Sequence, residues 1–185
     1  METVRLTAEF YGKGVCATDL AGAEALFPNP GFEDLFRLAW ELKVPFTIHS
    51  GEALGPESVY QALGFGAKRL GHGVRSVEDP ALLKRLAEEQ VTLELCPTSN
   101  LNTNIFASIE DYPLLALMDA GVRVTLNTDN LMVSGVTLQS EWEKVIRTFG
   151  LSGDQILTLQ KNAAEASFAS PKVKQWLLEQ VALGC

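Results

Sequence analysis

Four side chains that can bind a metal or carry a proton stand at or just after the ends of apolar, strand-like runs. His49 closes the run Val44–Ile48, and Glu52 comes three residues later. His72, the other of the two histidines, lies between two glycines at the close of a second run, and Asp129 follows a third. Imidazole nitrogen and carboxylate oxygen suit Zn²⁺, and a carboxylate beside a metal in a dry cleft is poised for proton transfer.

Each of these side chains also has a simpler interpretation when it is taken alone. An isolated histidine at a strand end is more often a structural hydrogen-bonding group than a ligand, and Glu52 alone fits a charge at a helix start. Asp129 alone could be the N-cap of the next segment, and residues 95–100 could be a strand ended by a turn. His72 is harder to explain by packing, because its flanking glycines indicate a close backbone approach.

The chain around these residues alternates between strand and helix patterns, which indicates parallel strands joined by helical crossovers. The strands are continuously apolar, as buried parallel strands are. Because the C-terminal ends of parallel strands lie on one edge of a sheet, the four side chains are expected to emerge together. Two helix starts are marked by Ser152, in a capping-box spacing with Gln155, and by Ser170 before Pro171. An α/β fold is predicted, with strands at 15–20, 44–49, 68–72, 91–96 and 122–128 and helices at 2–12, 31–43, 56–65, 77–89, 111–120, 136–149, 153–167 and 171–182.

Composition narrows the class of protein. The 185 residues are 46% apolar, enough for one sizeable core and a single domain over 1–185. The net charge of −8 and the scattered Lys and Arg argue against a nucleic-acid or anionic-membrane surface and favour a small, neutral substrate or a protein partner. No apolar run approaches the roughly 20 residues of a membrane span, and the start lacks a signal-peptide pattern. A soluble cytoplasmic protein is expected.

The three cysteines, Cys16, Cys96 and Cys185, are odd in number, far apart and without a CxxC pair. The first two fall within apolar strand patterns. Buried, reduced thiols in a reducing compartment are therefore expected.

In their order along the chain, five segments resemble the adenosine deaminase family, which consists of metal-dependent hydrolases of the amidohydrolase superfamily. The resemblance covers nearly the whole chain and implies part of a (β/α)₈ TIM barrel, about its last five βα units, followed by C-terminal helices. A closed barrel needs eight strands and typically about 250 residues, so this chain is too short to close one alone. The matching segments are Asp19-Leu20-Ala21-Gly22, Ile48-His49-Ser50-Gly51-Glu52, Leu70-Gly71-His72-Gly73, Glu94-Leu95-Cys96-Pro97-Thr98-Ser99-Asn100 and Asn127-Thr128-Asp129.

The resemblance implies a role for each site residue. His49 and Asp129 match ligands of a catalytic Zn²⁺, and Gly22 matches a backbone donor to the purine ring. Glu52 matches the residue that protonates the purine at N1, and His72 the residue that orients the zinc-bound hydroxide. Zinc lowers the pKa of its water to about 7, and the resulting hydroxide attacks the ring carbon that bears the amine.

The sequence departs from the family pattern at two places. The His-x-His pair that supplies two zinc ligands is absent, because the chain has only two histidines. Asn130 stands where many members have a second Asp in contact with the purine, and its amide can both donate and accept hydrogen bonds.

The expected function is zinc-dependent hydrolytic deamination of adenosine, or of a close aminopurine nucleoside, to inosine and ammonia, with the chain inactive alone. Two alternatives remain: a non-catalytic remnant that binds a purine or a partner, and a deaminase of another aminopurine. The strands at 15–20 and 122–128 would be open sheet edges, which template self-association or pairing with a complementary N-terminal segment.

Overall fold

Five parallel strands form a single sheet in the computed structural model of the chain, which describes residues 1–184. Neighbours in the sheet are also neighbours in the sequence, in the order β1-β2-β3-β4-β5, as expected for consecutive units of a barrel. This confirms the predicted α/β class and the strand pairing. The strands are β1 (Thr18–Leu20), β2 (Phe46–Ser50), β3 (Arg69–His72), β4 (Thr92–Leu95) and β5 (Arg123–Leu126).

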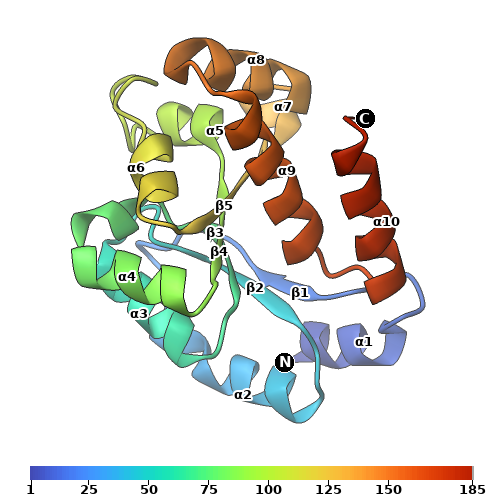
Figure 1. Cartoon of the computed structure of the whole chain (residues 1–185). Helices are drawn as coiled ribbons and strands as arrows, with labels where there is room; N and C mark the ends of the chain where they lie inside the picture. The colour runs from blue at the N-terminus through green and yellow to red at the C-terminus, as the bar shows by residue number, and fades with distance from the viewer. Residues whose placement is uncertain (185) are drawn as a thin grey trace.

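Helices connect the strands and cover the sheet, with α3 and α4 on one side of the strands and α9 and α10 on the other side in Figure 1. The helices that follow the first four strands include α2 (Glu33–Glu41), α3 (Pro56–Gly64), α4 (Pro80–Glu88) and α6 (Leu114–Asp119). The remaining elements are α1 (Glu2–Phe10), η1 (Asn29–Phe32), η2 (Val74–Glu78), α5 (Pro97–Asn102), α7 (Leu131–Ser134), α8 (Leu138–Phe149), α9 (Gly153–Ala166) and α10 (Pro171–Ala182).

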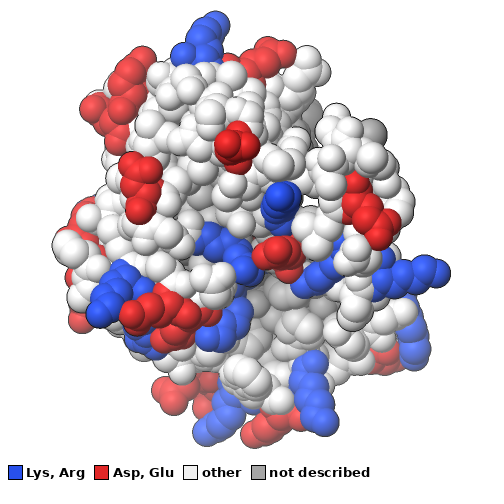
Figure 2. All heavy atoms as spheres, in the orientation of Figure 1, with Lys and Arg blue, Asp and Glu red and all other residues white. Residues whose placement is uncertain are grey.

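The core lies between the sheet and these helices. Ile48, Leu70 and Leu93 on three neighbouring strands are fully buried, and Phe36 of α2 and Leu82 of α4 belong to the same apolar cluster. No helix within residues 1–184 has the length and apolar content needed to cross a membrane. On the face shown in Figure 2, basic side chains lie next to acidic ones.

The predicted helix starts at Ser152 and Ser170 are confirmed. Ser152 Oγ accepts a hydrogen bond from the backbone N–H of Gln155, whose side chain accepts in return from the N–H of Ser152. Ser170 caps α10, with Pro171 as its first residue. Residues 95–100 were considered as a strand that ends in a turn. The strand ends at Leu95, but Pro97–Asn102 form the helix α5, because Pro97 occupies the first helical position, where no N–H is needed.

The prediction for Cys16 is wrong. The first strand begins three residues later than expected, at Thr18, and Cys16 lies exposed in the segment before it. Cys96 is buried as predicted, and burial raises the pKa of its thiol. Cys185 lies outside the described residues.

The two outer strands, β1 and β5, each pair with a single strand. Beside β5 lies an apolar cavity of about 340 Å³ whose lining includes Leu126, Trp142 and Leu159. Asn162 of α9 donates to the carbonyl of Val124 in this strand at 2.9 Å.

We expect the isolated chain to self-associate at micromolar concentration, because unpaired strand edges and exposed apolar side chains both promote association. Met132 and Phe27 are 91% and 62% exposed and add to the apolar surface. Sedimentation velocity over a concentration series checks this expectation. A monomer at all concentrations, with a two-state melt, would show that five strands make a self-sufficient sheet.

Candidate active site

The structure brings three of the predicted site residues around one cavity at the C-terminal edge of the sheet. His49 lies at the end of β2 and His72 at the end of β3, and their ring centroids are 5.1 Å apart. Asp129, after β5, lines the same cavity of about 130 Å³. The convergence follows from the parallel pairing, which places Ser50 opposite His72 and thus aligns the ends of both strands.

The glycine before His72 allows this approach. A Cβ at Gly71 would lie 2.5 Å from Cδ2 of His49, so any larger residue would displace the imidazole. The close backbone approach predicted from the glycines is therefore confirmed. His72 and Asp129 themselves have left-handed backbones, with φ of 59° and 57°, a conformation that is uncommon outside glycine and often found at functional sites.

Carboxylates surround His49. Its Nε2 lies 3.5 Å from Oδ2 of Asp19, the middle residue of β1. Burial alone would lower the pKa of His49, but the hydrogen bond with Asp19 and the charges of Asp19, Asp129 and Glu52 outweigh it, so the pKa of His49 lies above its ordinary value. Three carboxylates, those of Asp19, Asp129 and Glu52, therefore place negative charge around the ring of His49.

A complete metal cage is not present within residues 1–184, where no group of three or more His, Cys, Asp or Glu side chains is placed to hold one ion. The pair His49 and Asp129 has the ligand chemistry of zinc.

Glu52 and His72 lie together beside this cavity. Oε2 of Glu52 is 3.6 Å from Nε2 of His72, whose side chain is 2% exposed. Burial lowers the pKa of His72 below its ordinary value, and the charge of Glu52 offsets this only in part. Asn100 of α5 donates to Oε1 of Glu52 at 2.9 Å and also lies 3.1 Å from Nδ1 of His72.

Asn100 belongs to the helix α5, for which no role was predicted from the sequence. Its neighbour Ser99 donates to Oδ2 of Asp129 at 2.6 Å. Glu141 of α8, fully buried, accepts from both the N–H and the hydroxyl of Thr98 at 2.8 Å, and Lys144 also donates to that hydroxyl. The helix α8 therefore fixes α5 against the site.

Glu24 is a second residue that sequence reasoning missed. It is 6% exposed, and its carboxylate accepts hydrogen bonds from four consecutive backbone N–H groups, those of Gly51, Glu52, Ala53 and Leu54, at 2.7–3.2 Å. The hydroxyl of Ser58 also donates to it. Glu24 thus holds the backbone of the loop that carries Glu52. Its position two residues after Gly22 was the only available signal, and spacing alone does not reveal burial.

Gly22 and Asn130 lie around this centre. Gly22, with φ of 150°, has a backbone conformation that side chains rarely adopt, and it lines a cavity of about 170 Å³ together with Phe27 and His49. Because His49 lines both cavities, the two adjoin. Asn130 is exposed, and its Oδ1 accepts from the N–H groups of Met132 and Val133. The cap of the segment after β5 is therefore Asn130, whereas Asp129 had been considered.

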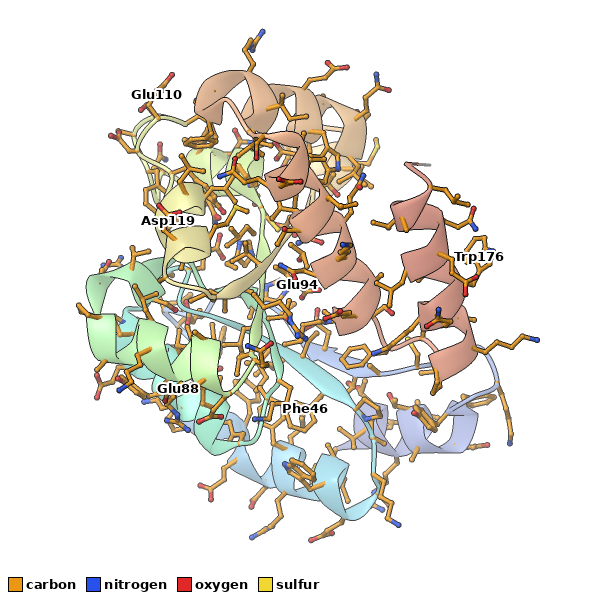
Figure 3. The ribbon with its side chains drawn as sticks, viewed as in Figure 1. Phe46, Glu88, Glu94, Glu110, Asp119 and Trp176 are labelled. Carbon is orange, nitrogen blue, oxygen red and sulfur yellow. The ribbon has the colours of Figure 1, made fainter. Side chains whose placement is uncertain are left out.

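Glu94, within a segment that carried the family resemblance, lies at the centre of the view in Figure 3, whereas Glu88 and Glu110 project outward. Its Oε1 lies 3.1 Å from Nε of Arg69, and the residue also lines the cavity of His49 and Asp129. Burial raises the pKa of Glu94, and the charge of Arg69 opposes this.

Comparison with known proteins places this arrangement in a family. The family model described as adenosine deaminase matches residues 1–183. The chain belongs to the adenosine deaminase family. It is 44% identical over 98% of its length to an adenosine deaminase of Haemophilus ducreyi, and 40% identical over 96% to one of Enterococcus faecalis. These alignments cover 54% and 53% of the two relatives, so the chain spans about half of their length.

Solved structures of adenosine deaminase-like proteins share the fold. An adenine deaminase from Arthrobacter aurescens superposes with a TM-score of 0.91 at 27% identity, covering 99% of this chain and 57% of the other. An N6-methyl-AMP deaminase from Arabidopsis thaliana gives 0.88 at 28% identity, covering 98% and 53%. The predicted partial barrel of the adenosine deaminase family is thereby confirmed. The named relatives deaminate different purines, so family membership leaves the substrate to be argued from the site.

Proposed function

We propose that this chain, as one domain over residues 1–185, supplies the C-terminal half of a zinc-dependent deaminase. The reaction is the hydrolysis of adenosine, or of a close aminopurine nucleoside, to inosine and ammonia. The observation that carries the proposal is the placement of His49, His72 and Asp129 around one cavity, with Glu52 against His72. Adenosine deaminases of 40% and 44% identity support adenosine as the substrate.

His49 and Asp129 would hold the metal. The fit rests on their donor chemistry, an imidazole nitrogen and a carboxylate oxygen, and on the cavity that both residues line. When bound, zinc would supply a nucleophile at neutral pH by lowering the pKa of a water molecule.

The remaining residues of the site act on the purine. Glu52 would hold a proton on its carboxyl group and transfer it to ring nitrogen N1, which makes the amine-bearing carbon more electrophilic. His72 would orient the attacking water. The backbone N–H of Gly22 would contact the purine from the adjoining cavity. The side-chain oxygen of Asn130 caps α7, which leaves its amide nitrogen for a purine contact.

Two observations favour other functions. The adenine deaminase and N6-methyl-AMP deaminase among the structural neighbours favour a deaminase of another aminopurine. The two-ligand metal site favours a non-catalytic protein that binds a purine or a partner. Parallel assays of adenosine, adenine and N6-methyl-AMP with the reconstituted protein separate the first alternative from the proposal, and the absence of turnover with bound zinc supports the second. The cytoplasm is the proposed location.

The isolated chain is expected to bind zinc only weakly, because two protein ligands are fewer than the three or four of typical zinc sites. His49→Ala should abolish the remaining binding, whereas exchange of the outward-facing Glu88 for Ala should not change it. Competition with a chromophoric chelator measures the affinity. Tight, stoichiometric zinc that survives both His49→Ala and Asp129→Ala would place the metal elsewhere.

A further inference from the structure

Asn100 is a fully buried side chain that joins both candidate catalytic groups. Its Nδ2 donates to Oε1 of Glu52 at 2.9 Å and lies 3.1 Å from Nδ1 of His72. Its Oδ1 accepts from the hydroxyl of Tyr112 at 3.1 Å. The amide nitrogen of Asn100 thus faces Glu52 and His72, and its amide oxygen faces Tyr112.

The partners decide which end of the amide faces which group. Tyr112 is buried, and burial raises the pKa of its hydroxyl well above the ordinary value, so this group keeps its proton and donates it to Oδ1. Because that hydroxyl proton occupies Oδ1, the amide nitrogen is the atom that faces Oε1 of Glu52 at 2.9 Å. Turning the amide over would place Nδ2, which cannot accept a hydrogen bond, against the hydroxyl proton of Tyr112.

This orientation constrains the imidazole. Since one N–H of Asn100 serves Glu52, the other faces Nδ1 of His72, which must then accept. In a neutral imidazole one ring nitrogen accepts and the other carries the proton. The proton of His72 therefore lies on Nε2, the nitrogen 3.6 Å from Oε2 of Glu52.

We propose that Asn100 is a positioning residue that fixes the spacing of Glu52 and His72 and holds His72 in the tautomer protonated at Nε2. This inference deepens the proposed function, because it assigns how its proton-carrying groups are arranged. The amide is itself held in place: the backbone carbonyl of Asn100 accepts from the N–H of Ile105, and the preceding turn is bound by Glu141.

The tautomer of His72 can be measured in the 185-residue chain and needs no turnover. The chain has only two histidines, so the signals of the two rings can be told apart. Protein labelled with ¹⁵N at histidine would be examined by long-range ¹H–¹⁵N correlation at about pH 8.5, well above the ordinary imidazole pKa of about 6.5. His49→Gln assigns the two rings. We expect Nδ1 of His72 to resonate as an unprotonated acceptor and Nε2 as a protonated nitrogen.

Two variants test the role of Asn100 itself. In Asn100→Ala both ring nitrogens of His72 should shift toward the average of exchanging tautomers, and in the isosteric Asn100→Asp the proton should move toward Nδ1. Tyr112→Phe, which removes only the donor to Oδ1, should shift the same two signals less. A proton on Nδ1 in the parent chain, or His72 signals unchanged by every folded variant, would overturn the inference.

Activity gives a separate reading. In the protein reconstituted with its N-terminal half, Asn100→Ala should lower kcat on the order of 10–100-fold, the range for residues that orient a group from outside the reacting atoms, with KM little changed. The two proposals can fail separately. If His72 has the expected tautomer but neither the parent protein nor any variant turns over adenosine, the proposed function fails and the inference about the tautomer stands. An Asn100→Ala protein whose kcat equals that of the parent would contradict the positioning role.

Discussion

Replacement of Glu52 by glutamine is expected to lower adenosine turnover on the order of 10²–10⁴-fold in the reconstituted protein, which is the usual loss when a general acid is removed. Glutamine keeps the size of the side chain and an oxygen that can accept from Asn100, so the site should stay assembled. What it lacks is the transferable proton. The absorbance change from adenosine to inosine measures the effect.

A nearby carboxylate serves as the matched control. Glu57 lies exposed in the first turn of α3, and Glu57→Gln should leave turnover within about twofold of the parent, as expected for a surface exchange. If Glu52→Gln kept a rate near that of the parent, Glu52 would not be the proton donor.

The chain is also expected to lose about 3 kcal/mol of unfolding free energy when Glu24 is replaced by alanine. The carboxylate accepts from four backbone N–H groups and from the buried hydroxyl of Ser58, and hydrogen bonds to a charged group are worth about 1.5–3 kcal/mol each. The loop residues Glu52, Ala53 and Leu54 are only partly buried or exposed, so water replaces some of these bonds and limits the loss.

Urea denaturation measures the change, with Glu41→Ala as the control, because Glu41 lies exposed in α2. The control should stay within about 0.5 kcal/mol of the parent. A Glu24→Ala midpoint equal to that of the control would mean that the loop does not depend on this carboxylate. Glu24→Gln should fall between the two, because its amide keeps one acceptor but directs N–H groups at the backbone donors.

The sequence predicted those parts of the fold that depend on local patterns. Alternating apolar runs predicted the five parallel strands, and the shared edge of such a sheet predicted that His49, His72 and Asp129 would meet. Gly71 was informative because a missing Cβ is itself a sign of close packing.

Contacts between distant segments left little local trace. Glu24 reaches loop residues about thirty positions away, and Glu141 reaches α5 from 43 positions away. Both are carboxylates whose burial depends on the assembled fold, and an isolated Glu in a sequence most often lies at the surface. Cys16 was misplaced because the apolar pattern begins three residues before the point where β1 starts, so the cysteine falls outside the strand.

The central claim is that this chain carries half of a zinc-dependent adenosine deaminase site, and reconstitution tests it most directly. The 185-residue chain would be combined with the part of the Haemophilus ducreyi adenosine deaminase that it does not match, with zinc, and adenosine followed by ultraviolet absorbance. Conversion to inosine only when both parts and zinc are present, and its loss in His49→Ala, is the predicted result. A folded, zinc-loaded complex that leaves adenosine unchanged, or conversion that survives His49→Ala, would contradict the claim.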